Sequence, residues 1–207
     1  ENNLPKITYS ALENITLVGQ SGENDTFAID GSTGNDAFQM QVGATAGSGS
    51  VTASLAGGAY SLPTIAFNGM SPTVENQINS AMLTNGGGQD TFKLIGTASA
   101  DTVAVTPAFT DGLFLAVSTG GDRVKVRADN MTLITLQCGD GNDTVNASGG
   151  VTAAFAVDGG NGTDAIHLSN VSDPDCTINT TAHQIYSFGA DFSYLNVENV
   201  DGATIIT

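Results

Sequence analysis

Two glycine- and aspartate-rich segments have the residue types and the spacing of a calcium-binding turn. Segment 159–167 reads Gly-Gly-Asn-Gly-Thr-Asp-Ala-Ile-His and fits the nonapeptide G-G-x-G-x-D-x-U-x, where U is apolar, at every fixed position. Segment 138–146 reads Cys-Gly-Asp-Gly-Asn-Asp-Thr-Val-Asn and departs from that pattern only at its first glycine. Glycine allows left-handed turns that expose carbonyl oxygens, and Ca²⁺ prefers six to eight hard oxygen ligands. Carboxylates and turn carbonyls with this spacing are therefore suited to Ca²⁺.

These turns belong to a larger pattern that recurs along the chain. Acidic residues followed by Asn stand at 13, 75, 129 and 198, and each of the first three is followed by two Gly/Asp turns. The first turn places aspartates at 25, 90 and 143, and the second at 36, 101 and 164. The pattern predicts one continuous domain of three repeats, 13–74, 75–128 and 129–197. Residues 1–12 read as the end of a preceding repeat, and 198–207 as the start of a further one.

Strands must position these turns. Short alternating β-prone runs such as 102–105, 123–127 and 204–206 are bounded by Gly, Asn and Asp, as in strands joined by turns. Turns about ten residues apart and an aliphatic composition favour an all-β parallel β-helix, or β-solenoid, with loop excursions. A tandem array of β-sandwiches is the alternative. We also expect a hairpin over 113–126, a short helix or loop over 74–83, and an exposed excursion over 43–58.

The motifs resemble a known family. The nonapeptides are similar to haemolysin-type (RTX) calcium-binding repeats, and the whole pattern resembles the repeat modules of very large secreted bacterial surface proteins. The resemblance implies bound Ca²⁺, an extracellular or cell-surface location and a structural role. Its candidate metal ligands are Asp25, Asp36, Asp90, Asp101, Asp140, Asp143, Asp158 and Asp164. The set Asp140, Asp143, Asp158 and Asp164 is the most favoured site.

The spacing of the turns departs from that family. An RTX β-roll repeats its nonapeptide in tandem, whereas the copies here lie 11, 21 or more residues apart. A complete ligand set would therefore need distant coils to stack on one another. The alternative is that the aspartates cap turns through Asx hydrogen bonds and hold no metal.

The composition excludes several classes of function. The 207 residues contain 5 Lys plus Arg against 21 Asp plus Glu, a formal net charge of −16. Such a chain has no basic footprint for nucleic acid or anionic lipid. No apolar run approaches the roughly 18 residues of a membrane-spanning helix, so we expect no membrane insertion. The first residue is Glu1 rather than Met, which we interpret as a mature or excised chain.

The two cysteines leave two alternatives open. Cys138 and Cys176 are the only cysteines of the chain. They are suited to one disulfide in an oxidising, extracellular setting, or to two buried free thiols.

Neither end of the chain reads as a polar cap, which solenoids normally need. The apolar end residues are Ile7, Tyr9, Ile15, Leu17, Val200, Ile205 and Ile206. We expect copies to stack head to tail as a filament, surface layer or fibre, or the chain to adjoin neighbouring repeats of a longer protein.

No arrangement of residues indicates an enzyme, because the two histidines are far apart and no G-x-S-x-G motif occurs. The alternative function is an adhesin module that binds carbohydrate or a partner protein. Its binding face would lie on excursions 43–72 and 170–190, near the aromatic cluster Phe188, Phe192 and Tyr194.

Overall fold

The computed structural model describes residues 14–18, 28–45, 47–68, 75–79, 89–107, 112–118, 122–129, 131–151, 153–189 and 191–206. The described chain is mostly β, and one 3-10 turn, η1 (Ala56–Gly58), is its single helical element. The first strands are β1 (Asn14–Val18), β2 (Ala28–Asp30), β3 (Ala37–Val42), β4 (Gly49–Leu55), β5 (Tyr60–Ser61), β6 (Thr64–Asn68), β7 (Glu75–Asn79), β8 (Thr91–Ile95), β9 (Thr102–Pro107) and β10 (Gly112–Ser118). The remainder are β11 (Asp122–Asp129), β12 (Leu133–Asp140), β13 (Thr144–Ser148), β14 (Ala154–Asn161), β15 (Ala165–Ser169), β16 (Thr177–Asn179), β17 (Gln184–Tyr186), β18 (Phe192–Leu195), β19 (Asn199–Asp201) and β20 (Thr204–Ile206).

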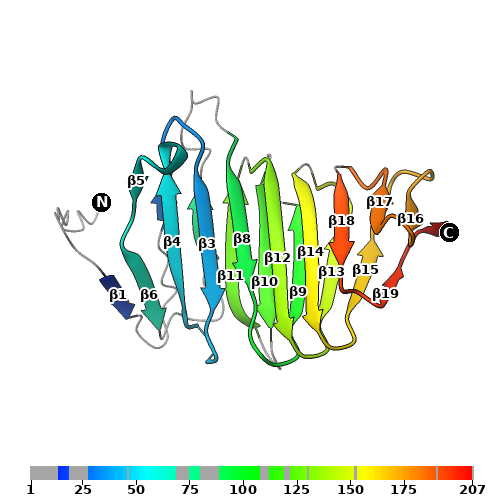
Figure 1. The fold of residues 1–207 in the computed structure, drawn as a ribbon, viewed down its shortest axis with the longest axis horizontal. Helices are drawn as coiled ribbons and strands as arrows, with labels where there is room; N and C mark the ends of the chain where they lie inside the picture. The colour runs from blue at the N-terminus through cyan, green and yellow to red at the C-terminus, as the bar shows by residue number, and fades with distance from the viewer. Residues whose placement is uncertain are drawn as a thin grey trace.

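The strands form two sheets in which most pairings are parallel. The 12-stranded sheet has the order β1-β6-β4-β3-β8-β12-β14-β18-β17-β16-β20, with β5 attached to β4. The 8-stranded sheet has the order β19-β15-β13-β9-β10-β11-β7-β2. From β12 to β15 successive strands alternate between the sheets, and both sheets extend along the long axis of the molecule (Figure 1). The predicted all-β class is therefore confirmed, and both sheets run through all three predicted repeats.

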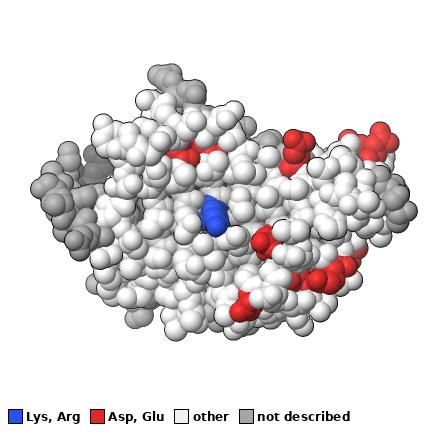
Figure 2. Space-filling model, in the orientation of Figure 1, with Lys and Arg blue, Asp and Glu red and all other residues white. Residues whose placement is uncertain are grey.

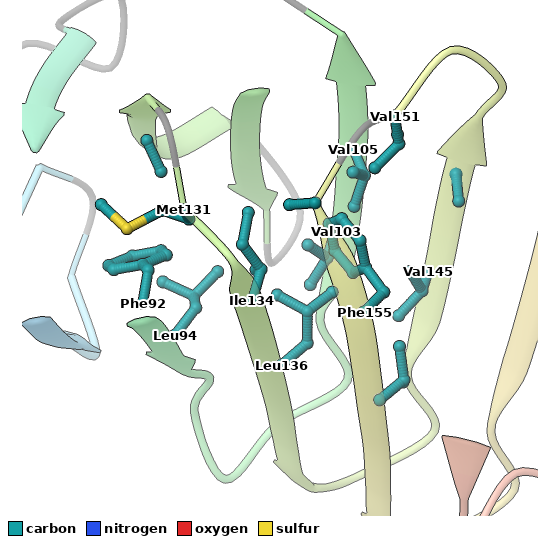
Figure 3. Close-up of a cluster of buried hydrophobic side chains, with 14 of the residues drawn as sticks. Phe92, Leu94, Val103, Val105, Met131, Ile134, Leu136, Val145, Val151 and Phe155 are labelled. Carbon is teal, nitrogen blue, oxygen red and sulfur yellow. The ribbon is translucent and has the colours of Figure 1, made fainter. Parts of the chain in front are cut away.

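Side chains from the two sheets meet in one core. Parallel register aligns like residues across the larger sheet, so that Phe92 lies opposite Ile134, and Ile134 opposite Phe155. The next inward position aligns Leu94, Leu136 and Val157 in the same way. Figure 3 shows Ile134, Leu136 and Phe155 of the larger sheet in one cluster with Val103, Val105 and Val145 of the smaller sheet. Strict alternation of inward apolar residues, visible in β12 and β14, builds these columns.

Three local predictions have clear outcomes. The hairpin is confirmed, because β10 pairs antiparallel with β11. The prediction of a short helix or loop over 74–83 is wrong over Glu75–Asn79, since this segment is β7 and pairs in parallel with both β11 and β2. The exposed excursion over 43–58 is also wrong in part, because β4 pairs with β3 and buries Val51 and Ala53. Small residues allowed β4 to join the sheet despite its low sequence complexity.

The two fold corrections share a physical cause. Polar and small residues have weak local preferences, and pairing with a neighbouring strand overrides such preferences. Sequence periodicity alone does not report which strand edge is available.

A conservative core substitution tests the column arrangement. Ile134→Val is expected to cost about 0.5–1.5 kcal/mol of unfolding free energy, because Ile134 is completely buried and loses one methyl group. Urea denaturation monitored by circular dichroism would measure this cost. The matched control is Ile95→Val, because Ile95 is half-buried on the outward side of β8. Equal costs for the two variants would contradict the inward placement of Ile134.

Acidic residues dominate the charged surface in the view of Figure 2. They gather on the half of this face nearer the C-terminus, while a basic patch lies at the centre of a largely uncharged area. Within the described ranges, no helix is long and apolar enough to cross a membrane.

Candidate functional site

A row of carboxylates joins the starts of four parallel strands in the smaller sheet. The Asp101 amide donates to Asp143 Oδ1 at 2.6 Å, and the Asp143 amide donates to Asp164 Oδ1 at 2.7 Å. The Asp164 amide donates to Glu198 Oε2 at 2.6 Å. We call Asp101, Asp143, Asp164 and Glu198 the carboxylate ladder. Each member immediately precedes one strand, so the ladder links β9, β13, β15 and β19.

A shorter row of the same kind lies in the larger sheet. The Asp36 amide donates to Asp90 Oδ1 at 2.8 Å, just before β3 and β8. The Asp36 carboxylate accepts hydrogen bonds from the Ser32 amide, the Ser32 hydroxyl and the Ala56 amide. This carboxylate therefore closes its own turn and holds the 3-10 turn η1 against it.

The ladder contains two buried oxygens without a partner. Asp143 is 1% exposed and Asp164 is 2% exposed. Their Oδ2 atoms have no hydrogen-bond partner among the described residues. By contrast, Asp101 Oδ2 accepts from the Thr97 amide at 2.6 Å, and Thr97 Oγ1 lies 3.1 Å from Asp101 Oδ1.

Glycines replace that threonine in the next two turns. Gly139 and Gly160 pair with each other in the register of β12 and β14, and both have positive φ, 111° and 96°. The turns at Asp143 and Asp164 consequently lack the threonine hydroxyl that caps the Asp101 turn. A buried carboxylate oxygen without a hydrogen-bond partner lowers the stability of the fold unless a proton, a water molecule or a cation binds to it.

The charges of the ladder affect each other. Burial raises the pKa of Asp143 to about 6, and the negative charges of Asp164, Asp101 and Asp140 add to the rise, although the Asp101 amide opposes it. Burial and, after it, the negative charges of Asp143, Asp164, Asp101 and Asp158 raise the pKa of the Cys138 thiol to about 12, so this thiol stays protonated. Cys138 and Cys176 are both buried and free.

The structure separates the four aspartates of the favoured metal site. Asp140 is exposed and its Oδ1 accepts from Asn161 Nδ2 at 2.8 Å. Asp158 Oδ1 accepts from Asn196 Nδ2 at 2.8 Å. In the part of the chain that is described, no three Asp, Glu, His or Cys side chains converge as a metal cluster. Asp25 lies outside the described residues.

The stacking partners also differ from the sequence repeats. Asp36 contacts Asp90, and Asp101 contacts Asp143, so the second turn of one predicted repeat stacks on the first turn of the next. Sequence reasoning missed Glu198 as a ladder member. Its signal was the Glu-Asn-Val run, which mirrors the Asp-Thr-Val run at Asp143.

No described strand covers the apolar columns at either end of the larger sheet, and we call these ends the open columns. Ile205 of β20 lies in register with Ile178 of β16, yet Ile178 is 0% exposed and Ile205 is 56% exposed. At the other end, Ile15 and Leu17 of β1 are only half-buried. Val200 is partly buried beside Ile166, Ile206 pairs with Asn179 through the backbone, and Ile7 and Tyr9 lie outside the described residues.

No protein-family profile, curated protein or solved structure matches this chain. Its function is therefore inferred from the carboxylate ladder, the open columns and the cavities of the described residues.

Removing one charge from the ladder is expected to stabilise the chain at neutral pH. An Asp143→Asn side chain keeps an oxygen for the Asp101 amide and removes a buried negative charge beside Asp164. Because the folded-state pKa of Asp143 is raised, its favourable contribution is complete at low pH and is lost as the pH rises through about 6. The variant escapes that loss, so we expect its Tm to exceed the native Tm by roughly 2–4 °C above pH 7.

Thermal melts from pH 8 to 4 in chelator measure this effect. The difference in Tm should shrink as the pH falls through about 6. Asp175→Asn, at an exposed site whose charge is not among those that raise the pKa of Asp143, is the matched control and should change Tm little at any pH. A difference in Tm that does not vary with pH would contradict the titration of Asp143.

Proposed function

We propose that this chain is an extracellular structural repeat module that stacks head to tail at the cell surface. The open apolar columns carry the proposal. An inward-facing Ile205 that is 56% exposed leaves core surface without a cover, and solenoids bury such surface against the next unit. A second copy of the chain, or neighbouring repeats of a longer protein, would provide that cover.

We also propose that the strands of the two sheets form the coils of a β-solenoid. Alternation of β12, β13, β14 and β15 between two sheets, with parallel register in each, is what one coil after another produces. The carboxylate ladder supports it further, because its hydrogen bonds link strands 42, 21 and 34 residues apart. The resemblance to modules of large secreted bacterial surface proteins supports the location.

Calcium belongs to the proposal as a stiffener of the ladder. Asp143 Oδ2 and Asp164 Oδ2 are the oxygens available as metal ligands, because neither has a hydrogen-bond partner among the described residues. Hard carboxylate oxygens of this kind suit Ca²⁺. A bound ion would neutralise the charge of the two carboxylates. The proposal leaves out Asp140 and Asp158, because the described Asp, Glu, His and Cys side chains form no group of three or more that could hold a metal ion.

Thermal melting with and without Ca²⁺ tests the metal. At a Kd of about 10⁻⁴–10⁻³ M, millimolar Ca²⁺ is expected to add roughly 1 kcal/mol to the unfolding free energy. Asp164→Asn should remove that gain, and Asp191→Asn, outside the ladder, should keep it. An unchanged Tm in Ca²⁺ would leave the aspartates as metal-free turn caps.

Electron microscopy and sedimentation velocity of the purified chain test the assembly. Fibres of uniform width, or particles that grow with concentration, are the expected result. Repeating both measurements in chelator reports whether Ca²⁺ takes part. A monomer at every concentration would contradict stacking between copies.

A further inference from the structure

A cavity of about 530 Å³ lies beside the strands β17 and β18, away from the carboxylate ladder. It is lined by Gly150, by residues 171–173 and by residues 184–189 with 191 and 192. Its size is within the range of small-molecule sites. The lining comes from three separate segments of the chain, so the folded arrangement is needed to form it.

The wall of the cavity combines aromatic rings with polar groups. Phe188 and Phe192 are buried and pack edge to face, with ring centroids 5.7 Å apart, and they form an apolar base. Tyr186 is 42% exposed, and its hydroxyl donates to Gln184 Oε1 at 2.7 Å. This hydrogen bond restrains the phenol ring of a side chain that remains partly exposed.

The turn that presents this tyrosine is unusual. Ser187 has a positive φ of 58°, and Gly189 follows with a φ of 117°. Non-glycine residues in this region cost energy and persist where the surrounding structure holds them. The turn thus sets Tyr186 outward and Phe188 inward within three residues.

The charges of the lining select the ligand. Asp173 and Asp191 are exposed carboxylates, and the lining contains no Lys, Arg or His. Asp173 Oδ1 accepts from the Asp175 amide, and the Asp191 carboxylate has no partner among the described residues. Such a wall repels anions and offers acceptors to hydroxyl groups.

We propose that this cavity binds an uncharged carbohydrate. The C–H faces of a sugar ring would stack on Tyr186, and its hydroxyls would donate to Asp191, Asp173 and the Gln184 amide oxygen. Apolar faces edged by hydroxyls match a wall of this composition better than an acidic sugar or an apolar molecule does.

This site goes beyond the structural role and does not depend on it. Strand β16 lies between β17 and the outer strand β20 in the sheet order, so the cavity strands are not at the open edge. Sugar binding and stacking can therefore be measured separately, the first on dilute monomer.

Titration with a panel of neutral oligosaccharides tests the proposal. The panel contains trisaccharides of glucose, galactose, mannose and N-acetylglucosamine. Binding is monitored by saturation-transfer NMR and by tyrosine fluorescence, which is usable because the chain has no Trp. At least one neutral trisaccharide should bind. Tyr186→Ala should weaken that binding by about tenfold or more, because the stacking contact is lost.

Matched variants separate binding from folding. Tyr60→Ala removes another exposed tyrosine, on β5, and should leave the affinity unchanged. Asp191→Asn keeps the shape of an exposed side chain and should weaken binding by several-fold without changing Tm. A trigalacturonate and a trilysine peptide serve as anionic and cationic probes.

Three results would overturn the proposal. They are the absence of binding by every neutral trisaccharide at about 10 mM, equal affinity in the native chain and in Tyr186→Ala, and binding of trilysine or trigalacturonate in place of the neutral sugars.

Discussion

Replacing Gly160 by alanine is expected to destabilise the chain by about 3 kcal/mol or more. A Cβ at this position would lie 1.9 Å from the carbonyl oxygen of Gly139 on the neighbouring strand, and Gly160 has a φ of 96°. The obstacle is backbone and cannot rotate away, so β12 and β14 would have to separate. Chemical denaturation monitored by circular dichroism would measure the loss.

A second glycine isolates the effect of the close approach. Gly57 has a φ of 68°, and a Cβ there meets nothing within 4 Å. Gly57→Ala should therefore cost only the left-handed strain, roughly 1–2 kcal/mol. Similar losses at Gly57 and Gly160 would mean that contact between neighbouring strands does not require glycine.

Placing a charge in the open column is expected to abolish assembly. In an Ile205→Lys variant, an ammonium group would have to be buried against the next copy without a partner, at a cost of several kcal/mol. The folded monomer should tolerate the change, because Ile205 is 56% exposed. Sedimentation velocity over a wide concentration range should then give monomer where the native chain assembles.

The control variant carries the same charge outside the column. Leu195 is 53% exposed, and it pairs in register with Asp158 on the outward side of the larger sheet. Leu195→Lys should leave assembly unchanged. If both lysine variants assembled like the native chain, the open column would not be the contact between copies.

Much of the fold was readable from the sequence, because its cause is local. Alternation in runs such as 102–105 predicted strands, and the Gly-Gly pair at 120–121 predicted the hairpin that β10 and β11 form. The strand at β7 was missed, since its Glu-Asn-Gln-Ile-Asn sequence has one apolar residue and depends on β11 and β2 for pairing. Tertiary context of this kind leaves no periodicity to read.

The site was predicted in part. Sequence spacing identified the aspartates of the ladder but grouped them by their order in the repeat. In the structure, Asp101 neighbours Asp143, 42 residues away, and Asp143 neighbours Asp164, 21 residues away. The longer interval contains the hairpin of β10 and β11. Asp140 and Asp158 shared the glycine-rich context of the buried pair, and only the fold shows that each accepts a hydrogen bond from an asparagine side chain.

The direction of the strands has a mechanical consequence. Strand β1 lies at one end of the long axis and β19 at the other, the strands run across that axis, and the backbone hydrogen bonds that join neighbouring strands point along it (Figure 1). Tension applied between the two ends would load these bonds along their own direction and break a few at a time. We expect strands to peel off one after another at low force, each adding length and absorbing work, as in an extensible tether.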